Sequence, residues 1–358
     1  MNKFKIEHID PLGQGVFKNK DEIYFIPKTL PSEEGHFEIL QRKKGVHFAQ
    51  VTQLTYTSPN RIEPDCFHYN QCPGCHFLHT DYQTELDIKK ATFERWLQNF
   101  EHPEIEIMQS LKRLHYRNRI QLHYEGELIG LVDARKRAIV PISKCQIMLP
   151  ELKEAFDKFL GSWKSIRKKQ QQPKKGHVEL YFINDEVKVS WNQRYAAGGF
   201  TQVHGALNEQ IKDWIKLNYD NRQNGLLELF GGDGNLSSKL NFDYRVCVDL
   251  YQESTLGKVS LNLFEEEALQ DFISKDDRIF KTLFIDPPRS GHKQLSSWVE
   301  HYKPDQILYM SCNPVTQIND IKPILEDYEI KSVLLIDLFA STYHFESIIA
   351  MQRKETSF

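Results

Sequence analysis

The sequence lacks any long apolar run. Uninterrupted apolar stretches are short, as in Val333-Leu334-Leu335-Ile336, whereas a helix that crosses a bilayer needs about 20 consecutive apolar residues. The N-terminus also lacks a basic segment followed by an apolar one, which is the pattern of a secretory signal peptide. We therefore expect a cytoplasmic protein that does not bind membranes.

An excess of charge of one sign is also absent. The net charge of −3 gives no overall attraction for nucleic acid, so any contact with RNA must come from local basic patches. Cysteine is sparse, and in a reducing compartment the six cysteines favour a metal site or catalysis over disulfides. With 358 residues, 40% of them hydrophobic, the chain can form two or three domains. No protein partner is evident, and we expect a monomer.

Residues 1–57 alternate apolar and polar positions, as in Glu22–Ile26, and place glycines at turns. This pattern predicts a small β-barrel. Three stretches resemble the TRAM domain, an OB-like RNA-binding barrel found on RNA-modifying enzymes: Asp10–Val16, Leu30–Glu33 and Ser58–Pro64. Pro31-Ser32-Glu33 departs from the usual Pro-Gly-Glu of that domain. The alternation by itself fits an ordinary barrel equally well.

Three closely spaced cysteines follow, with a fourth much later in the chain: Cys66, Cys72, Cys75 and Cys145. The first three stand in an irregular segment that cannot build an apolar core of its own. Four thiolates suit either tetrahedral zinc or an iron–sulfur cluster, and their spacing does not choose between the two. His68, His76 and His79 are alternative zinc ligands, but four thiols complete a site without them. We predict a central α+β domain, residues 58–198, that holds a metal.

The rest of this central region contains one helix signal and two basic runs. Apolar residues at helical spacing predict an amphipathic helix over 82–100, and the segment 81–110 is expected to pack on the C-terminal domain. Leu111–Arg119 mixes cations with aromatic residues, which suits phosphate contact and base stacking. A solvated charged face fits this run equally well. Lys164–Lys169 is interpreted as a mobile basic loop that adds non-specific attraction to RNA.

From residue 199 onward strands and helices alternate, which predicts a Rossmann-like α/β domain over 199–358. The strands end on residues that carry chemistry. Gly231–Asn235 forms a glycine-rich turn after the first strand, Asp249 ends the second strand, and Asp286 ends a later one. Ligands bind at this edge of open α/β sheets, where glycines allow a close approach and an acid can bind ribose hydroxyls. A glycine-rich turn alone also fits NAD enzymes.

Cys312 ends the next strand, which Asn313-Pro314 terminates. A buried structural cysteine is the alternative, but the neighbouring strand ends carry matching chemistry, so we interpret Cys312 as a nucleophile. The glycine-rich turn, the acids and a C-terminal hairpin together outline a class I methyltransferase dependent on S-adenosylmethionine (SAM). Methylation of a pyrimidine ring carbon needs such a thiol, because C5 is a poor nucleophile until a group adds at C6.

At these residues nearly the whole chain resembles the RNA uracil-C5 methyltransferases, the family that makes 5-methyluridine in bacterial ribosomal RNA and in tRNA. The resemblance is carried by Asp286-Pro287-Pro288-Arg289, Ser311-Cys312-Asn313-Pro314 and His344-Phe345-Glu346. It implies that Cys312 is the nucleophile and that Glu346 removes the C5 proton after methyl transfer. His344 is given a positioning or structural role.

The resemblance also implies the binding residues. Phe200 would face a uracil flipped out of the RNA, and the four cysteines would hold a [4Fe–4S] cluster. The SAM pocket would be lined by Gln202, Phe230, Asn235, Asp249, Glu265 and Asp286. The chain departs from the family at Gly232, where cysteine is common, and in a short segment after Asp249. Because of that shortening, Glu265 is matched to the acid beside adenine only by its position upstream of Asp286.

Three other functions compete with methylation of 23S ribosomal RNA, which the barrel and the cluster together favour. The first is uracil-C5 methylation of tRNA. A cytosine-C5 methyltransferase also uses a thiol, but it usually has Pro or Thr where this chain has Ser311, and it lacks the His-x-Glu pair. A catalytically decayed RNA-binding protein would have lost the nucleophile, the base and the cofactor acids, all of which this chain keeps.

Overall fold

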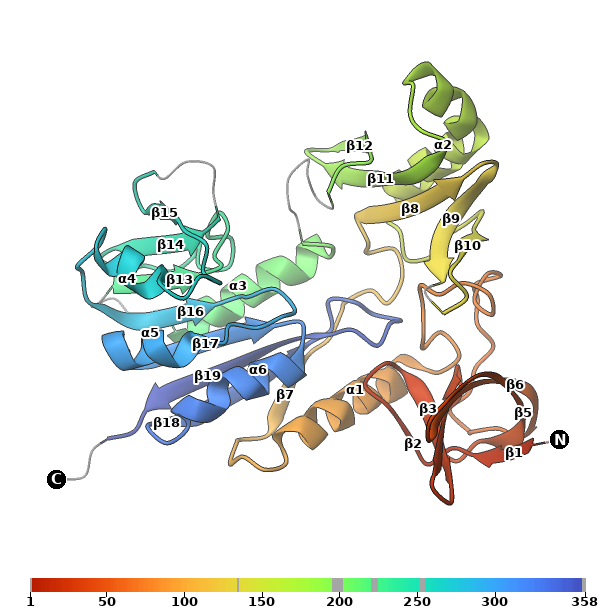
Figure 1. Cartoon of the computed structure of the whole chain (residues 1–358), viewed down its shortest axis with the longest axis horizontal. Helices are drawn as coiled ribbons and strands as arrows, with labels where there is room; N and C mark the ends of the chain where they lie inside the picture. The colour runs from red at the N-terminus through yellow and green to blue at the C-terminus, as the bar shows by residue number, and fades with distance from the viewer. Residues whose placement is uncertain (1, 134, 195–201, 220–224, 251–254, 356–358) are drawn as a thin grey trace. The chain divides into compact units, whose positions relative to one another are not determined.

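The computed structural model of the chain describes residues 2–133, 135–194, 202–219, 225–250 and 255–355 (Figure 1). The chain forms two compact units, and both are discontinuous in sequence. The first comprises Met1–Lys89, Ser110–Gly205 and Leu338–His344; the second comprises Lys90–Gln109, Ala206–Asp337 and Phe345–Phe358. No helix in the described part of the chain is long and apolar enough to cross a membrane.

The first unit begins with a six-stranded sheet. Its strands lie in the order β1 (Asn2–Lys5), β5 (Glu34–Lys43), β6 (Val46–Tyr56), β4 (Glu22–Pro27), β3 (Gln14–Asn19) and β2 (His8–Ile9). Every neighbouring pair is antiparallel except β4 and β6. Tyr24 and Ile26 point into an apolar cluster with Phe4 and Phe37, as the alternation predicts. The strands expected in residues 1–57 are thus present, while closure into a barrel stays a prediction.

A five-stranded antiparallel sheet carries most of the rest of the first unit. Its order is β10 (Ala138–Pro141), β9 (Leu128–Asp133), β8 (Arg119–Glu125), β11 (Lys175–Ile183) and β12 (Glu186–Trp191). Helix α2 (Pro150–Lys169) covers it by burying Leu152, Phe156, Phe159 and Trp163, which recur at helical spacing. The basic run Lys164–Lys169 forms the end of this helix, so the expected mobile loop was wrong. Lysine and arginine are good helix formers, and cations in the last turn favour the helix dipole.

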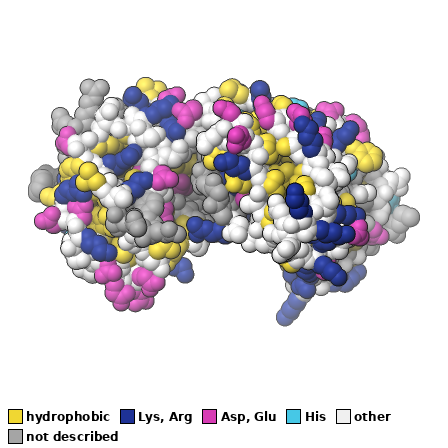
Figure 2. Space-filling model, turned by 90° about the horizontal axis from the view of Figure 1, so that it is seen from above, with side chains coloured by type: hydrophobic (Ala, Val, Ile, Leu, Met, Phe, Trp, Pro, Cys, Tyr) yellow, Lys and Arg dark blue, Asp and Glu magenta, His cyan; other side chains and the backbone are white. Residues whose placement is uncertain are grey.

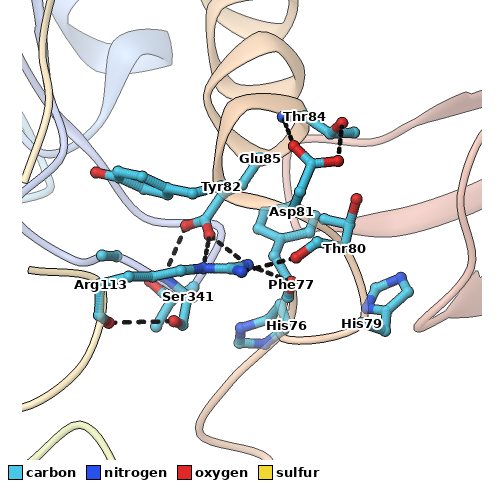
Figure 3. A network of polar contacts seen from close by, with 12 residues as sticks. His76, Phe77, His79, Thr80, Asp81, Tyr82, Thr84, Glu85, Arg113 and Ser341 are labelled. Atoms are coloured by element: carbon cyan, nitrogen blue, oxygen red, sulfur yellow. Dashed lines mark hydrogen bonds and ion pairs between the residues drawn. The ribbon is translucent and has the colours of Figure 1, made fainter. Parts of the chain in front are cut away.

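The predicted amphipathic helix is α1 (Tyr82–Leu97), and the boundary between the two units falls inside it, after Lys89. Its start carries a buried ionic network, drawn in Figure 3. The fully buried carboxylate of Glu85 accepts hydrogen bonds from Lys89 Nζ at 2.8 Å, Arg113 Nε at 2.9 Å and the Ser341 backbone N at 2.6 Å. Arg113 Nη1 also donates to Thr80 O at 2.7 Å. The network joins three segments of the first unit that are distant in sequence.

The second unit is built on one eight-stranded sheet. Its order is β15 (Lys258–Ser260), β14 (Arg245–Asp249), β13 (Gly225–Leu229), β16 (Phe280–Ile285), β17 (Gln306–Ser311), β19 (Glu346–Arg353), β18 (Tyr328–Ile336) and β7 (Ile105–Met108). The first five are mutually parallel, whereas β19 runs antiparallel to both neighbours and so forms the predicted C-terminal hairpin with β18. The strand order reverses between β13 and β16, where open α/β sheets bind ligands.

Both faces of this sheet are buried. On one face Ile285, Ile307 and Tyr309 belong to a core cluster with residues of α4 (Ala268–Ile273), α5 (Leu295–Tyr302) and α6 (Pro314–Ile321). The alternate residues Phe284, Leu308 and Met310, on the other face, are buried as well. Burial on two sides explains why these strands read as continuous apolar runs. Helix α3 (Gly205–Tyr219) and the single turn η1 (Lys322–Ile324) complete the described elements.

Candidate active site

Cys312 lies between the end of β17 and the start of α6, as the sequence predicted. Asn313 caps the helix, because its side-chain oxygen accepts a hydrogen bond from Val315 N at 3.2 Å. Pro314 occupies the first turn, where its missing N–H costs nothing. The other side-chain atom of Asn313, Nδ2, donates to Arg289 O at 2.9 Å. The residue after the cysteine therefore fixes both the helix start and the backbone of Arg289.

The sheet register sets Cys312 against Glu346. In the antiparallel pair β17–β19, Ser311 is opposite Ser347, so the next residues outward on the two strands, Cys312 and Glu346, lie opposite each other at the end of the ladder. Directly opposed residues project from the same face with their Cβ atoms about 4.5–5.5 Å apart. The two residues carried by separate sequence motifs are thus neighbours.

Asp286 joins them from the adjacent strand. It directly follows β16, whose Ile285 pairs with Tyr309 of β17. Because side chains alternate between faces, Asp286 lies on the face of Phe284, which is the face shared by Met310 and Cys312. Burial, together with the nearby acids Glu228 and Asp249, raises the pKa of Asp286 to about 7. The structure therefore brings Asp286, Glu346 and the Cys312 thiol to one sheet edge, with Glu228 and Asp249 close to Asp286.

Burial and mutual repulsion shape the chemistry of this edge. Burial raises the pKa of Glu346 well above its usual range; Asp286 adds to the rise and Arg289 opposes it. The pKa of Cys312 is raised to about 11, first by burial and then by Glu346, while the charge and a hydrogen bond of Arg289 lower it. The resting thiol is therefore protonated at neutral pH. Arg289 is the group that favours the thiolate. In the sequence Arg289 stood out only as the last residue of the Asp-Pro-Pro-Arg motif, which did not indicate this role.

The glycine-rich turn after β13 is held by Asp249. Its Oδ2 accepts a hydrogen bond from Gly232 N at 2.9 Å, and its Oδ1 accepts one from Leu250 N at 2.6 Å. Gly232 and Gly234 both have positive φ, at 52° and 73°, and a Cβ on Gly234 would stand 3.0 Å from Cys247 Sγ. Glycine is required in this tight turn. The acid predicted to bind ribose therefore also shapes the turn.

The other predicted cofactor residues are placed as follows. The ring of Phe230 contacts those of Phe264 and His292, with centroids 5.4 and 5.1 Å apart. Asn235 exchanges two hydrogen bonds with Asn208 of α3, at 3.2 and 3.0 Å.

Two other predicted residues have contacts elsewhere in the described structure, and a third lies outside the described residues. Glu265 is exposed and bonds locally, accepting from Asn262 Nδ2 at 2.7 Å. Gln202 belongs to the first unit, where its backbone oxygen accepts from Asn118 Nδ2 at 2.8 Å. Phe200 lies outside the described residues.

Glu228 was missed by the sequence reasoning. It is buried within β13 and accepts hydrogen bonds from Ser237 Oγ and, at 3.2 Å, from Cys247 Sγ. Burial raises its pKa. An acid at the centre of the apolar run Leu226–Leu229 is the signal that could have identified it, since an unpaired carboxylate is costly in a core. Cys247, on the neighbouring strand β14, is buried as well.

The four cysteines of the first unit are all partly buried and form no disulfide. Burial raises the pKa of Cys72, Cys75 and Cys145, and each is raised further by at least one other thiol of the set. The thiols are therefore close to one another, and as donors they fit zinc or an iron–sulfur cluster. Within the described residues, however, no group of three or more His, Cys, Asp or Glu side chains is arranged to hold a metal ion.

The basic run Leu111–Arg119 is mostly internal. Arg113 is bound to Glu85, and Arg119 forms a fully buried ion pair with Glu179 at 3.0 Å. These two cations are therefore committed within the first unit and are not free for phosphate, while Lys112 is exposed. Figure 2 shows Lys and Arg side chains interspersed with Asp and Glu, in keeping with the net charge of −3. Sequence alone could not separate cations in buried ion pairs from those in solvent.

The chain is similar to several known RNA methyltransferases. Residues 262–354 match the family model described as tRNA (Uracil-5-)-methyltransferase. The chain is 28% identical to an uncharacterized RNA methyltransferase of Leptospira interrogans, and the match covers 96% of this chain and 93% of that protein. It is also 24% identical to the 23S rRNA (uracil(1939)-C(5))-methyltransferase RlmD of Shewanella woodyi, with the match covering 96% of this chain and 94% of that protein.

A solved structure extends the likeness to the fold. The tRNA (uracil-54, C5)-methyltransferase of Pyrococcus abyssi is 19% identical and has a TM-score of 0.69, covering 98% of this chain and 100% of that one. This likeness confirms the predicted class I methyltransferase fold. The family match spans Asp286, Cys312 and Glu346 and, with the relatives, confirms the predicted enzyme class.

Proposed function

We propose that this RNA uracil-C5 methyltransferase transfers a methyl group from SAM to C5 of a uridine through a covalent adduct with Cys312. The observation that carries the proposal is the placement of Cys312 opposite Glu346 at the end of β17–β19, with Asp286 on the neighbouring strand and Arg289 hydrogen-bonded to the thiol. A thiol next to a buried carboxyl matches the two roles that methylation of a pyrimidine carbon requires, a nucleophile and a base.

The proposed reaction begins at the thiol. The Cys312 thiolate adds to C6 of the uracil, and the electrons of the C5–C6 double bond move onto O4 as an enolate. The positive guanidinium of Arg289 favours the thiolate against burial and Glu346. Bound SAM would supply an electrophilic methyl group. As C5 forms its new bond to that methyl carbon, the bond from the carbon to the sulfonium sulfur breaks and S-adenosylhomocysteine is released. These roles use the residues nearest the thiol.

Glu346 completes the reaction. It removes the proton from the methylated C5, after which the electrons of that C–H bond re-form the C5–C6 double bond and the C6–S bond breaks, releasing Cys312. A carboxylate whose pKa is raised is a stronger base than an exposed one, and Glu346 is raised by burial and by Asp286. The neighbouring carbonyl acidifies the proton, so a carboxylate suffices.

The same sheet edge suits SAM. Open α/β sheets bind ligands beyond the strand ends where the strand order reverses, which here is between β13 and β16. At these strand ends lie the turn Gly231–Asn235 and the residues Phe230, Asp249 and Asp286. The acids gathered there would attract the positively charged sulfonium of SAM. The related Pyrococcus abyssi structure contains S-adenosyl-L-homocysteine. Gln202 and Glu265 stay proposed cofactor contacts, and Phe200 stays the proposed contact of the flipped uracil.

The proposed substrate is 23S ribosomal RNA, in the cytoplasm. Relatives named as 23S rRNA (uracil(1939)-C(5))-methyltransferases match this chain over nearly their whole length. A tRNA substrate is the second candidate, because the matching family and the Pyrococcus abyssi structure carry tRNA in their names. Purified enzyme and SAM should form 5-methyluridine in a 23S transcript and little in tRNA, as measured by nuclease digestion and mass spectrometry. Methylation of tRNA alone would reverse the assignment, and methylation of neither would refute the activity.

We also propose that Cys66, Cys72, Cys75 and Cys145 hold a [4Fe–4S] cluster, supported by the mutual proximity of the four thiols. The cluster would tie the irregular segment 65–75 to the segment around Cys145, and no step of the reaction passes through it. Protein purified without oxygen should contain iron and sulfide in equal amounts. One zinc per chain and no sulfide would contradict the cluster.

A further inference from the structure

Two buried polar side chains, those of Gln317 and Ser347, join the strand ends that carry Cys312 and Glu346 by way of the backbone carbonyl of Ser311. Ser347 Oγ lies 2.7 Å from Gln317 Oε1 and 3.2 Å from Ser311 O, so its hydroxyl hydrogen is shared between the two acceptors. Gln317, Ser347 and Ser311 are each 0% exposed. We call these three residues the polar bridge.

The polar bridge also reaches the backbone of β17. Gln317 Nε2 donates to Tyr309 O at 2.8 Å, so one amide from α6 is bonded to β17 and, through Ser347, to β19. The backbone ladder already holds these strands together. The bridge adds a side-chain link at the last residue pair of that ladder, Ser311 and Ser347.

The polar bridge and the reactive pair occupy opposite faces of the same rung. Ser311 and Ser347 are paired in register, and each directly neighbours one reactive residue, Cys312 or Glu346. Successive side chains along a strand point to opposite faces. The bridge therefore lies on the face covered by α6, and the reactive residues lie on the other face, so that the bridge acts through the backbone and contacts no substrate.

The start of helix α6 also holds the backbone of Arg289, the group that favours the thiolate. Asn313 Nδ2 and Thr316 Oγ1 both donate to Arg289 O, at 2.9 and 3.3 Å. One helix thus fixes the backbones that present the thiol, the carboxyl and the guanidinium. A leucine at position 317 would fill similar space without needing polar partners, and a buried amide is costly unless its bonds are made. The polar choice therefore adds orientation rather than packing.

We propose that Gln317 is a positioning residue that sets the distance between the Cys312 thiol and the Glu346 carboxyl through Ser347 and Ser311. Its effect on catalysis rests on the proposed function, whereas its effect on the thiol exists in the free protein. Three charged or titratable groups face the thiol: Glu346 from β19, and Arg289 and Asp286 from the segment after β16. Among these, Glu346 is the group whose separation from the thiol the bridge controls.

The test measures the pH midpoint of Cys312 alkylation in the free protein, read at that residue by mass spectrometry after iodoacetamide treatment. In the unchanged protein the midpoint should lie near the pKa of about 11. Gln317→Leu should lower it by about one pH unit, because the carboxylate that disfavours the thiolate moves away. In a Glu346→Gln background the same change should cause no further shift. Ser347→Ala provides a second variant if Gln317→Leu does not fold.

Tyr328→Phe is the matched control. Tyr328 is buried in β18 and its hydroxyl donates to Pro304 O at 2.7 Å, so the change removes a similar hydrogen bond near the opposite edge of the sheet. It should leave the alkylation midpoint unchanged. An unchanged midpoint in Gln317→Leu and Ser347→Ala overturns the proposal. An equal shift with and without Glu346 also overturns it, because the bridge would then act only by excluding water.

The catalytic consequence separates this proposal from the proposed function. With RNA and SAM, Gln317→Leu should lower kcat by roughly 10²-fold, the effect of displacing reacting groups by about 1 Å. The KM for SAM should not change, because β13 and β14 carry no part of the polar bridge. A shift in the alkylation midpoint in a protein that methylates no uridine would support the positioning role and refute the proposed function. A lower kcat with no such shift would refute the positioning role alone.

Discussion

The carboxyl group of Asp286 shows how strongly its position in the fold changes the pKa of a residue. Burial and the acids Glu228 and Asp249 raise its pKa to about 7, against an ordinary value of about 3.9. In the free protein this side chain is therefore protonated about half the time at neutral pH. A positive charge placed beside it would favour the carboxylate and release the proton.

SAM binding should therefore release a proton from Asp286. The release should approach one proton per SAM at pH 6, where the free side chain is mostly protonated, and should vanish by pH 8.5, where it is already charged. Calorimetric titration in two buffers of different ionisation enthalpy measures this number. Asp286→Asn should abolish the release, whereas Asp305→Asn, a change in an exposed ion pair with Arg353, should not. A release that persists in Asp286→Asn would contradict the placement of the sulfonium beside this acid.

Burial also raises the pKa of the Cys312 thiol, although its proposed reaction requires the charged thiolate. Its pKa near 11 keeps it protonated at rest, because burial and Glu346 oppose the negative charge. A nucleophile needs the thiolate, so Arg289 has to stay in place when substrate binds. Asn313 and Thr316 secure the backbone of that arginine. In the proposed mechanism the same helix cap therefore both terminates the strand and helps to favour the thiolate of Cys312.

At the scale of elements, the ionic network at the start of α1 secures the first unit. Glu85 is fully buried and is bonded to Lys89. Its bonds to Arg113 and to the backbone of Ser341 are drawn in Figure 3. Ser341 belongs to the segment Leu338–His344, which directly precedes Phe345 and Glu346 in the chain. Burial is costly for an unpaired charge, and the pairing of Glu85 with two cations offsets that cost.

Removing that carboxylate should destabilise the protein strongly. Glu85→Ala removes a fully buried carboxylate that contacts both Lys89 and Arg113, which should cost about 3–5 kcal/mol of unfolding free energy. Urea denaturation followed by circular dichroism measures the loss. Glu154→Ala breaks the ion pair between Glu154 and Lys158, whose side chains are 71% and 74% exposed, and should leave the unfolding free energy nearly unchanged. Equal losses in the two variants would show that the network does not stabilise the first unit.

At the scale of the molecule, the sequence predicted the parts that local patterns determine. Apolar runs ending at Asp249, Asp286 and Cys312 identified parallel strands and their carboxyl edge, because burial on both faces leaves no room for polar residues. Alternation identified the strands of residues 1–57. The class I methyltransferase fold was predicted from those strand ends and confirmed by the structural likeness.

What the sequence could not predict depends on contacts between distant segments. Arg113 and Arg119 read as cations for RNA, and only the fold pairs them with Glu85 and Glu179. The opposition of Cys312 to Glu346 follows from the register of β17 and β19, and no spacing along the chain encodes that register. Gln317 had no signal at all, since a glutamine in an amphipathic helix is usually exposed.

The most direct test of the account uses Glu346→Gln with SAM and RNA that carries the target uridine. Without the base, addition of Cys312 and methyl transfer remain open but the C5 proton stays in place, so a protein–RNA adduct should accumulate. Denaturing electrophoresis with labelled methyl groups should show this adduct, and the added change Cys312→Ala should abolish both the adduct and 5-methyluridine. Normal turnover by Glu346→Gln would contradict its role as base, and methylation by Cys312→Ala would contradict covalent catalysis at this strand end.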